Sequence, residues 1–205
     1  MMKSVKKAII AALCAGTLVV GSVAGTMAYL TDQTAVVQNT FTVGKVGITL
    51  DEAAVDAYGV MVRDDDGNLV DRVTTNSYKL MPGHEYIKDP KIHVASNSED
   101  SWLFVKVENG IADIEADTKI AAQMTQNGWS LVANETNVYA YSEKVSANEN
   151  INVFGSFKLS GDANVSAYEN AAINITAYAV QADGFANAAA AWVAAPASWT
   201  AAVAN

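Results

Sequence analysis

Cysteine and histidine are nearly absent from this chain of 205 residues. The single cysteine, Cys14, lies in an apolar N-terminal run that we expect to be removed, so the rest of the chain can form no disulfide and has no cysteine nucleophile. The two histidines, His84 and His93, lack the helical spacing and the neighbouring Glu of a zinc protease, and we expect both to be exposed to solvent. No Gly-x-Ser-x-Gly motif is present either. The sequence therefore predicts a protein that is not an enzyme and that uses no metal and no cofactor.

Basic residues are also few. There are 13 lysines and arginines against 22 aspartates and glutamates, which gives a net charge of −9. Loss of residues 1–28 would remove three lysines and no acidic residue, so the remaining chain would carry −12. Such a charge argues against binding to nucleic acid or anionic lipid and favours solubility, although it also suits any solvated secreted surface. Residues 29–205 are enough for one domain with an adequate core.

The N-terminus has the composition of an export signal. Three lysines within residues 1–7 precede the apolar run Ala8–Val20, and small residues follow up to Ala28. As a helix, the apolar run would span about 20 Å, which is short of the roughly 30 Å of a bilayer core. A helix that continued to Ala28 would reach across, so an uncleaved membrane anchor is the alternative. The small residues Thr26 and Ala28 favour cleavage by a signal peptidase.

Apolar and polar residues alternate along most of the remaining chain, as they do in strands. The parity of the apolar residues changes between 41–43 and 46–50, so we expect a strand corner at Gly44. A short helix is expected within residues 111–127, with Asp117 or Thr118 as its cap and Gly128 after its end. Further strands are expected at 58–62, 69–73, 78–81, 91–94, 101–107, 129–132, 137–141, 151–159 and 173–179.

The C-terminal part is rich in alanine, which favours a second short helix within residues 186–195. Phe185, Ala188 and Trp192 would share one face of it, and Pro196 would end it. Together these elements predict an all-β fold, an antiparallel jelly-roll-like β-sandwich with one short middle helix and a short C-terminal helix. The expected organisation is a signal peptide (1–28), an N-terminal strand segment (29–43), the sandwich domain (44–184) and a helical tail (185–205).

A run of acidic residues, 64–68, separates two of the expected strands. Its Asp-Gly pair tolerates the positive φ of a type I′ turn, so we interpret the run as a hairpin turn. A calcium loop is the alternative, because Asp64, Asp66 and Asn68 have the spacing of the first ligands of an EF-hand. The twelfth position of such a loop would be Thr75 instead of Glu, which favours the hairpin.

Several segments together resemble the TasA and camelysin family of exported proteins. At the N-terminus these are the cleavage region Gly25–Asp32 and the segments Asn39–Gly44 and Val46–Leu50. The resemblance implies the same sandwich fold and export through a dedicated, SipW-type signal peptidase, with the cut between Ala28 and Tyr29. Shorter similar pieces follow at 80–83, 88–90, 98–100, 104–107 and 173–185.

The same resemblance implies a secreted structural protein that assembles into fibres of the extracellular matrix or cell surface. The N-terminus created by the cut, Tyr29 to about Val43, would be a donor strand that fills an open sheet edge of a neighbouring subunit. The partners would be further copies of the chain, the signal peptidase and accessory matrix proteins, and the membrane would be met only before cleavage. The expected apolar anchors of the donor strand are Tyr29, Leu30, Val36, Val37 and Phe41.

Two other functions stay open from the sequence. Exposed aromatic side chains could form the sugar-stacking platform of a monomeric glycan-binding module, although aromatic residues on alternating strands are more often part of a core. A secreted peptidase is the label carried by camelysin-type relatives, without a zinc motif here to support it. The residues considered for the platform are Trp102, Trp129, Tyr139 and Tyr141.

Overall fold

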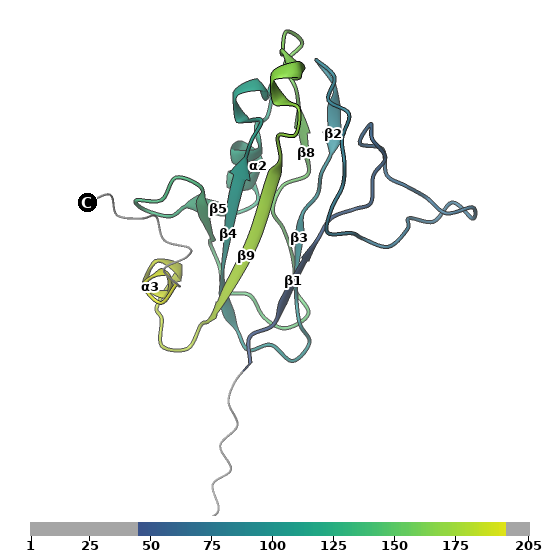
Figure 1. The fold of residues 1–205 in the computed structure, drawn as a ribbon. Coiled ribbons are helices and arrows are strands. Elements are labelled where there is room, and N and C mark those ends of the chain that lie inside the picture. Colours follow the sequence, from purple (N-terminus) through teal and green to yellow (C-terminus); the bar gives the residue numbers. More distant parts are fainter. Residues whose placement is uncertain (1–44, 196–205) are drawn as a thin grey trace, which may run out of the picture. The chain divides into compact units, whose positions relative to one another are not determined.

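The computed structural model describes residues 45–195, which form a mostly β structure with three antiparallel sheets and two short α-helices (Figure 1). The expected signal, the cut after Ala28, the five donor-strand anchors, the corner at Gly44 and the stop at Pro196 lie outside the described residues. No helix within residues 45–195 is long and apolar enough to span a bilayer. The elements are β1 (Ile48–Asp51), β2 (Glu85–Ile87), β3 (Lys91–Val94), β4 (Ser101–Asn109), the 3₁₀ turn η1 (Ala112–Ile114), α2 (Ile120–Gln126), β5 (Trp129–Leu131), β6 (Val138–Tyr141), β7 (Asn150–Asn152), β8 (Ser156–Lys158), the 3₁₀ turn η2 (Val165–Tyr168), β9 (Ile173–Gln181) and α3 (Ala188–Trp192).

The largest sheet has the strand order β5-β6-β4-β9. Its interior strand β4 pairs with β6 on one side and with β9 along its full length on the other. Because side chains of a strand alternate between the two faces, β4 contributes to two apolar clusters. Leu103, Val105 and Val107 belong to the main core, and Trp102 and Phe104 belong to a second cluster on the opposite face. The strand expected at 101–107 is confirmed, and it extends to Asn109.

Two smaller sheets, β1-β3-β7 and β2-β8, contribute the rest of the main core. Ile92 and Val94 of β3, Tyr86 of β2 and Phe157 of β8 are buried there. The rings of Tyr86 and Phe157 stack with their centroids 4.8 Å apart. Residues of all three sheets therefore share one apolar cluster, and each large side chain buried in it contributes about 1.5–3 kcal/mol.

The C-terminal helix α3 packs on the second cluster. Asn187 is its N-cap, and the Asn187 side chain accepts a hydrogen bond of 2.9 Å from the N–H of the third helical residue, which is the usual role of Asn at this position. The ring of Trp192 lies 5.0 Å from that of Phe104, centroid to centroid. Phe185 and Ala188 contact the same cluster. The expected terminal helix and its apolar face are confirmed.

The expectation of one continuous strand at 151–159 is wrong. The chain forms two strands, β7 and β8, in two different sheets. Side chains of α2 and of its C-cap hold the backbone between them. Gln123 Oε1 accepts a hydrogen bond from the N–H of Gly155 (3.0 Å), and Nδ2 of the C-cap Asn127 donates to the carbonyl of Val153 (3.1 Å). These bonds replace those of a strand ladder, which lets the chain pass from one sheet to the other.

The strand expected at 78–81 is also absent. The hydroxyl of the buried Tyr86 takes the place of a partner strand, since it accepts a hydrogen bond from the N–H of Met81 and donates one to the carbonyl of Lys79, both at 2.7 Å. A turn at Pro82 and Gly83 follows, with Gly83 at a φ of +75°.

The middle helix α2 is confirmed, but its predicted cap is wrong. Lys119 is the N-cap and contributes no side-chain hydrogen bond. Glu115 Oε1, in place of Asp117 or Thr118, accepts a hydrogen bond of 3.3 Å from the first helical N–H. Gly128 follows the helix with a φ of +87°, as the sequence predicted.

The acidic run closes a turn, but not the expected type I′ turn. An antiparallel bridge pairs Arg63 with Leu69, and Asp64 Oδ1 accepts two N–H groups of the turn at 3.0 and 2.8 Å. Gly67 is the turn residue with a positive φ, +84°, whereas type I′ requires two. The flanking segments form isolated bridges instead of strands.

Candidate functional site

Two strands at the edges of different sheets border the candidate site. β1 is an outer strand of β1-β3-β7 and β9 is an outer strand of the largest sheet, so in the described part of the chain each has a strand partner on one side only. The two strands lie side by side with no hydrogen-bond ladder between them (Figure 1). The open edge of a strand is a template for pairing with a further strand.

Two hollows follow the gap between the end of β1 and the start of β9. One has a volume of about 390 Å³ and is lined by Glu52, Lys88 and the first residues of β9. The other, of about 540 Å³, extends from the same two residues to Tyr78 and Phe157. Because the hollows share part of their lining, we treat them as one feature, the edge groove, which is bordered by β1, residues 74–78 and β9.

The two bordering strands carry apolar side chains that the fold covers only in part. These side chains pack against the main core from the edge, yet they stay half-buried. Removing apolar surface from water is worth roughly 25 cal/mol per Å², so an apolar strand laid along this edge would be stabilised. The side chains are Ile48 and Leu50 of β1 and Ile173, Ile175, Ala177 and Ala179 of β9.

A buried ion pair lies in the lining that the two hollows share. Lys88 Nζ donates a hydrogen bond of 2.7 Å to Glu52 Oε2, and the two residues are only 7% and 5% exposed. Within the described residues, this is the one hydrogen bond that either side chain makes. An ammonium group has three N–H donors and a carboxylate has two acceptor oxygens. The pair therefore keeps hydrogen-bonding capacity for a group that enters the edge groove.

Tyr78 lies next to this pair. Its ring centroid is 5.9 Å from Lys88 Nζ, which is within the range of a cation–π contact. Its hydroxyl donates a hydrogen bond of 3.1 Å to the carbonyl of Ile87. Burial, together with the negative charge of Glu52, raises the pKa of Tyr78 well above its ordinary value. The phenol is therefore a neutral hydrogen-bond donor at any physiological pH.

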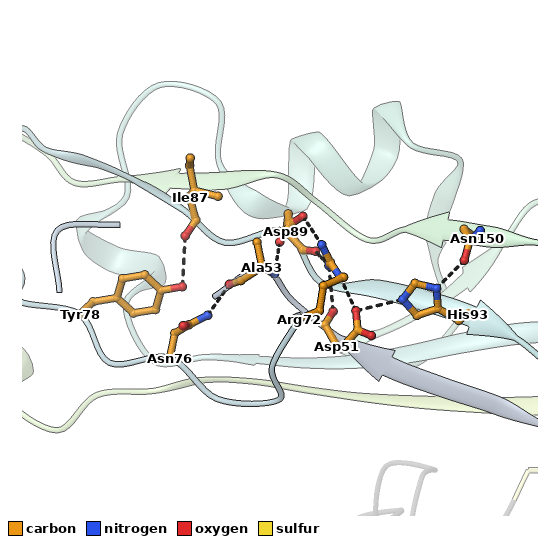
Figure 2. Close-up of polar contacts among 9 residues, drawn as sticks. All are labelled: Asp51, Ala53, Arg72, Asn76, Tyr78, Ile87, Asp89, His93 and Asn150. Atoms are coloured by element: carbon orange, nitrogen blue, oxygen red, sulfur yellow. Dashed lines mark hydrogen bonds and ion pairs between the residues drawn. The ribbon is translucent and has the colours of Figure 1, made fainter. Parts of the chain in front are cut away.

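Arg72 ties the end of β1 to the turn between β2 and β3 (Figure 2). Its Nε donates to Asp51 Oδ1 at 2.5 Å, and its two Nη atoms donate to the carboxylate and the carbonyl of Asp89 at 2.9 and 2.8 Å. Asp89 Oδ1 also accepts a hydrogen bond from the N–H of Ala53 at 2.6 Å. These contacts fix the backbone on either side of Glu52, and so they hold one border of the edge groove in place.

His93 extends the same network along β3 (Figure 2). Its Nε2 lies 2.9 Å from Asp51 Oδ1, and its Nδ1 contacts the Asn150 side chain. Burial alone would raise the pKa of Asp51, but the hydrogen bonds from Arg72 and His93 outweigh it and hold that pKa below its usual value. Asp51 is therefore an ionised carboxylate with one partner on β3, His93, and another, Arg72, in the segment between β1 and β2.

The expectation that both histidines are exposed to solvent is wrong. His84 and His93 are half-buried, and His84 Nε2 lies 2.9 Å from the carbonyl oxygen of Tyr58. Within residues 45–195, no group of three or more His, Cys, Asp or Glu side chains is placed to hold a metal ion.

The aromatic residues considered for a sugar platform do not form an exposed surface. Trp129 is 1% exposed, and its indole N–H donates to the carbonyl of Asn152 at 2.9 Å. Trp102 is 8% exposed in the second cluster, while Tyr139 and Tyr141 are half-buried against the main core. The two tryptophans are core residues.

The Glu52–Lys88 pair was not predicted from the sequence. Its members are 36 positions apart, and alternation within a strand carries no information on contacts at that distance. The sequence offers one weak signal for it, which is that each of the two charged residues directly adjoins apolar residues, at 53–55 and at 86–87.

Comparisons of the chain with models of protein families, with curated proteins and with solved structures gave no match in any of the three.

Proposed function

We propose that this chain is a secreted structural protein whose copies assemble into extracellular fibres by donating an N-terminal strand. The donor is the segment 29–43, which a signal peptidase frees by cutting after Ala28, and the receiver is the edge groove of the next copy. The observation that carries the proposal is the pair of open strand edges, β1 and β9, beside an incompletely covered apolar wall. With the donor in place, the receiver would become a closed jelly-roll-like sandwich.

The donor segment has a suitable length and composition. At about 3.3 Å per residue, nine residues of a strand span roughly 30 Å, the length of β9, and the segment has 15 residues. Side chains of a strand alternate, so the proposed anchors fall on two faces. Val37 and Phe41 share one face and would point to the core, while Val36 would lie on the other.

Part of the edge groove must widen to admit a strand. Neighbouring strands lie about 4.8 Å apart, so a strand between β1 and β9 needs about 9.6 Å. Some Cα atoms of the two strands lie within 8 Å of each other. The donor therefore separates β1 from β9 at those points and uses existing space at the hollows. The charge of −12 on residues 29–205 makes free copies repel, so that association depends on this specific contact.

Sedimentation and electron microscopy of the purified chain 29–205 test the proposal. We expect fibres above a threshold concentration, and monomers from the uncut chain 1–205. Ile175→Lys places a charge on the half-buried wall of the edge groove and should prevent assembly. Thr49→Lys, the matched control on the exposed face of the other bordering strand β1, lines neither hollow and should assemble normally. Thermal melting of both variants establishes that they are folded.

A mixture of isotopically labelled and unlabelled copies identifies the strand that fills the groove. Cross-links between residues 29–43 and β9 should join two different copies. Monomers at every concentration, with those cross-links confined to single copies, would overturn the proposal.

A further inference from the structure

We infer that Asn39 of the donor copy hydrogen-bonds the buried Glu52–Lys88 pair of the receiving copy and thereby sets the register of the donor strand. The inference rests on the proposed function and deepens it, because it names the contact by which the groove selects one segment in one position.

The starting point is the chemistry of the edge groove. Polar residues of 74–77 and 169–170 line part of it, whereas the half-buried side chains of β1 and β9 form its apolar wall. The Glu52–Lys88 pair lies in the lining that both hollows share and is itself buried. A wholly apolar strand above the pair would seal off N–H donors of Lys88 and an oxygen of Glu52 without partners. Buried polar groups without partners are strongly unfavourable. The occupant that fits must bring one polar side chain to this point, with apolar side chains before and after it.

The donor segment carries such a pattern on one of its two faces. The other face, at positions 34, 36, 38, 40 and 42, is polar except for Val36, and it suits the solvent side. Within residues 35–43, the face that would point to the core has one polar side chain, Asn39, with two apolar residues on each side of it. Those residues are Ala35, Val37, Phe41 and Val43.

An amide is the side chain that best suits an existing ion pair. The Glu52–Lys88 pair is neutral as a whole, so a third charge brought next to it would be buried without compensation. The carboxamide of Asn39 offers an oxygen that accepts from Lys88 and an NH₂ group that donates to Glu52. A single buried Asn fixes register in coiled coils for the same reason, since shifted pairings leave it unpartnered.

The position of the pair along the groove agrees with this register. Asn39 at the level of Ile173 and Ile175 leaves apolar donor residues on both sides of it. Those on one side cover the wall at Ala177, and those on the other cover the wider hollow that Phe157 lines. A shift by one residue would turn the polar face of the donor toward the core, and a shift by two would place an apolar residue on the pair.

Asn39→Leu tests the inference in the chain 29–205, with Gln38→Leu as its matched control. Both changes replace an amide by leucine in the same segment, but only residue 39 faces the pair. We expect the critical concentration for assembly to rise about tenfold to a hundredfold for Asn39→Leu, as for the loss of a hydrogen bond to a charged group. Gln38→Leu should leave it nearly unchanged. In chains that also carry Glu52→Leu and Lys88→Met, we expect the reverse. The chain with leucine at position 39 should then have a lower critical concentration for assembly than the chain with asparagine there.

The outcomes separate the two proposals. Wild-type fibres together with equal critical concentrations for Asn39→Leu and Gln38→Leu would overturn the inference and leave the proposed function intact. Failure of the wild-type chain to form fibres would overturn both. If the Glu52 and Lys88 changes prevent folding, the comparison of residues 39 and 38 still decides, because it leaves the described domain unaltered.

Discussion

Replacement of Lys88 by methionine measures how much the fold depends on its buried ion pair. The ammonium lies 2.7 Å from the Glu52 carboxylate, and both residues are more than nine-tenths buried. Methionine keeps most of the aliphatic volume but leaves a carboxylate buried without its partner. Breaking a buried pair in this way costs about 3–5 kcal/mol. In a domain of this size, 1 kcal/mol corresponds to about 2–4 °C, so we expect Tm to fall by about 6–20 °C.

Urea unfolding of the chain 29–205, followed by circular dichroism, gives the free energy of unfolding directly. The double variant Glu52→Leu, Lys88→Met removes both charges, and we expect it to lie within about 1 kcal/mol of the wild type or above it. Lys158→Met is the control. Its pair with Asp117 is as close, at 2.5 Å, but both side chains are exposed, so Tm should hardly change. A loss for Lys88→Met no larger than that for Lys158→Met would refute the reasoning.

Three further predictions concern the described domain. Gly59→Ala should lower the free energy of unfolding by more than about 2 kcal/mol, because φ is +76° and the added Cβ would lie 2.7 Å from the backbone of Tyr86. Gly67→Ala, at a φ of +84° but with open space around the added Cβ, should lower it by only about 1 kcal/mol. Urea unfolding of the two variants measures the difference. Burial raises the pKa of Glu115, so the protonated form is favoured on folding and its contribution to stability is lost as pH rises through the folded pKa. Glu115→Gln should therefore raise Tm at pH 7 but not below pH of about 4, and a gain that persists in acid would contradict this. Trp129→Phe removes the indole hydrogen bond to the carbonyl of Asn152 and leaves part of a buried site unfilled. It should cost about 1–3 kcal/mol in urea, and a smaller loss would contradict a role in the core.

The pattern of apolar residues predicted those elements in which local alternation and tertiary packing agree. β4 is the clearest case, since both of its faces are buried and both are apolar in the sequence. The Ala-rich helix α3 was predicted for a similar reason, because the same residues that favour a helix also contact the second cluster.

Elements held by side chains from distant parts of the chain were not predicted. Alternation continues from 151 to 159, but side chains of α2 hold the backbone at Gly155 and divide the strand. Residues 78–81 look like a strand and are paired with the hydroxyl of Tyr86 instead. The contact between Glu52 and Lys88 was not predicted for the same reason, because the sequence around neither residue indicates which distant residue it pairs with.

The pairing of β9 with β4 has a consequence for the order in which the chain matures. Asn109 pairs with Ile173 and Ser101 with Gln181, so β9 joins a strand far earlier in the chain. Contacts of such sequence separation form late, because a long loop must be closed first, and the N-terminal part of a chain is synthesised first. One wall of the edge groove is therefore completed last. In a fibre built as proposed, the N-terminal segment of a copy could insert into a neighbour before the edge groove of that copy had formed. A copy whose β9 had not yet paired would therefore terminate a growing fibre instead of extending it.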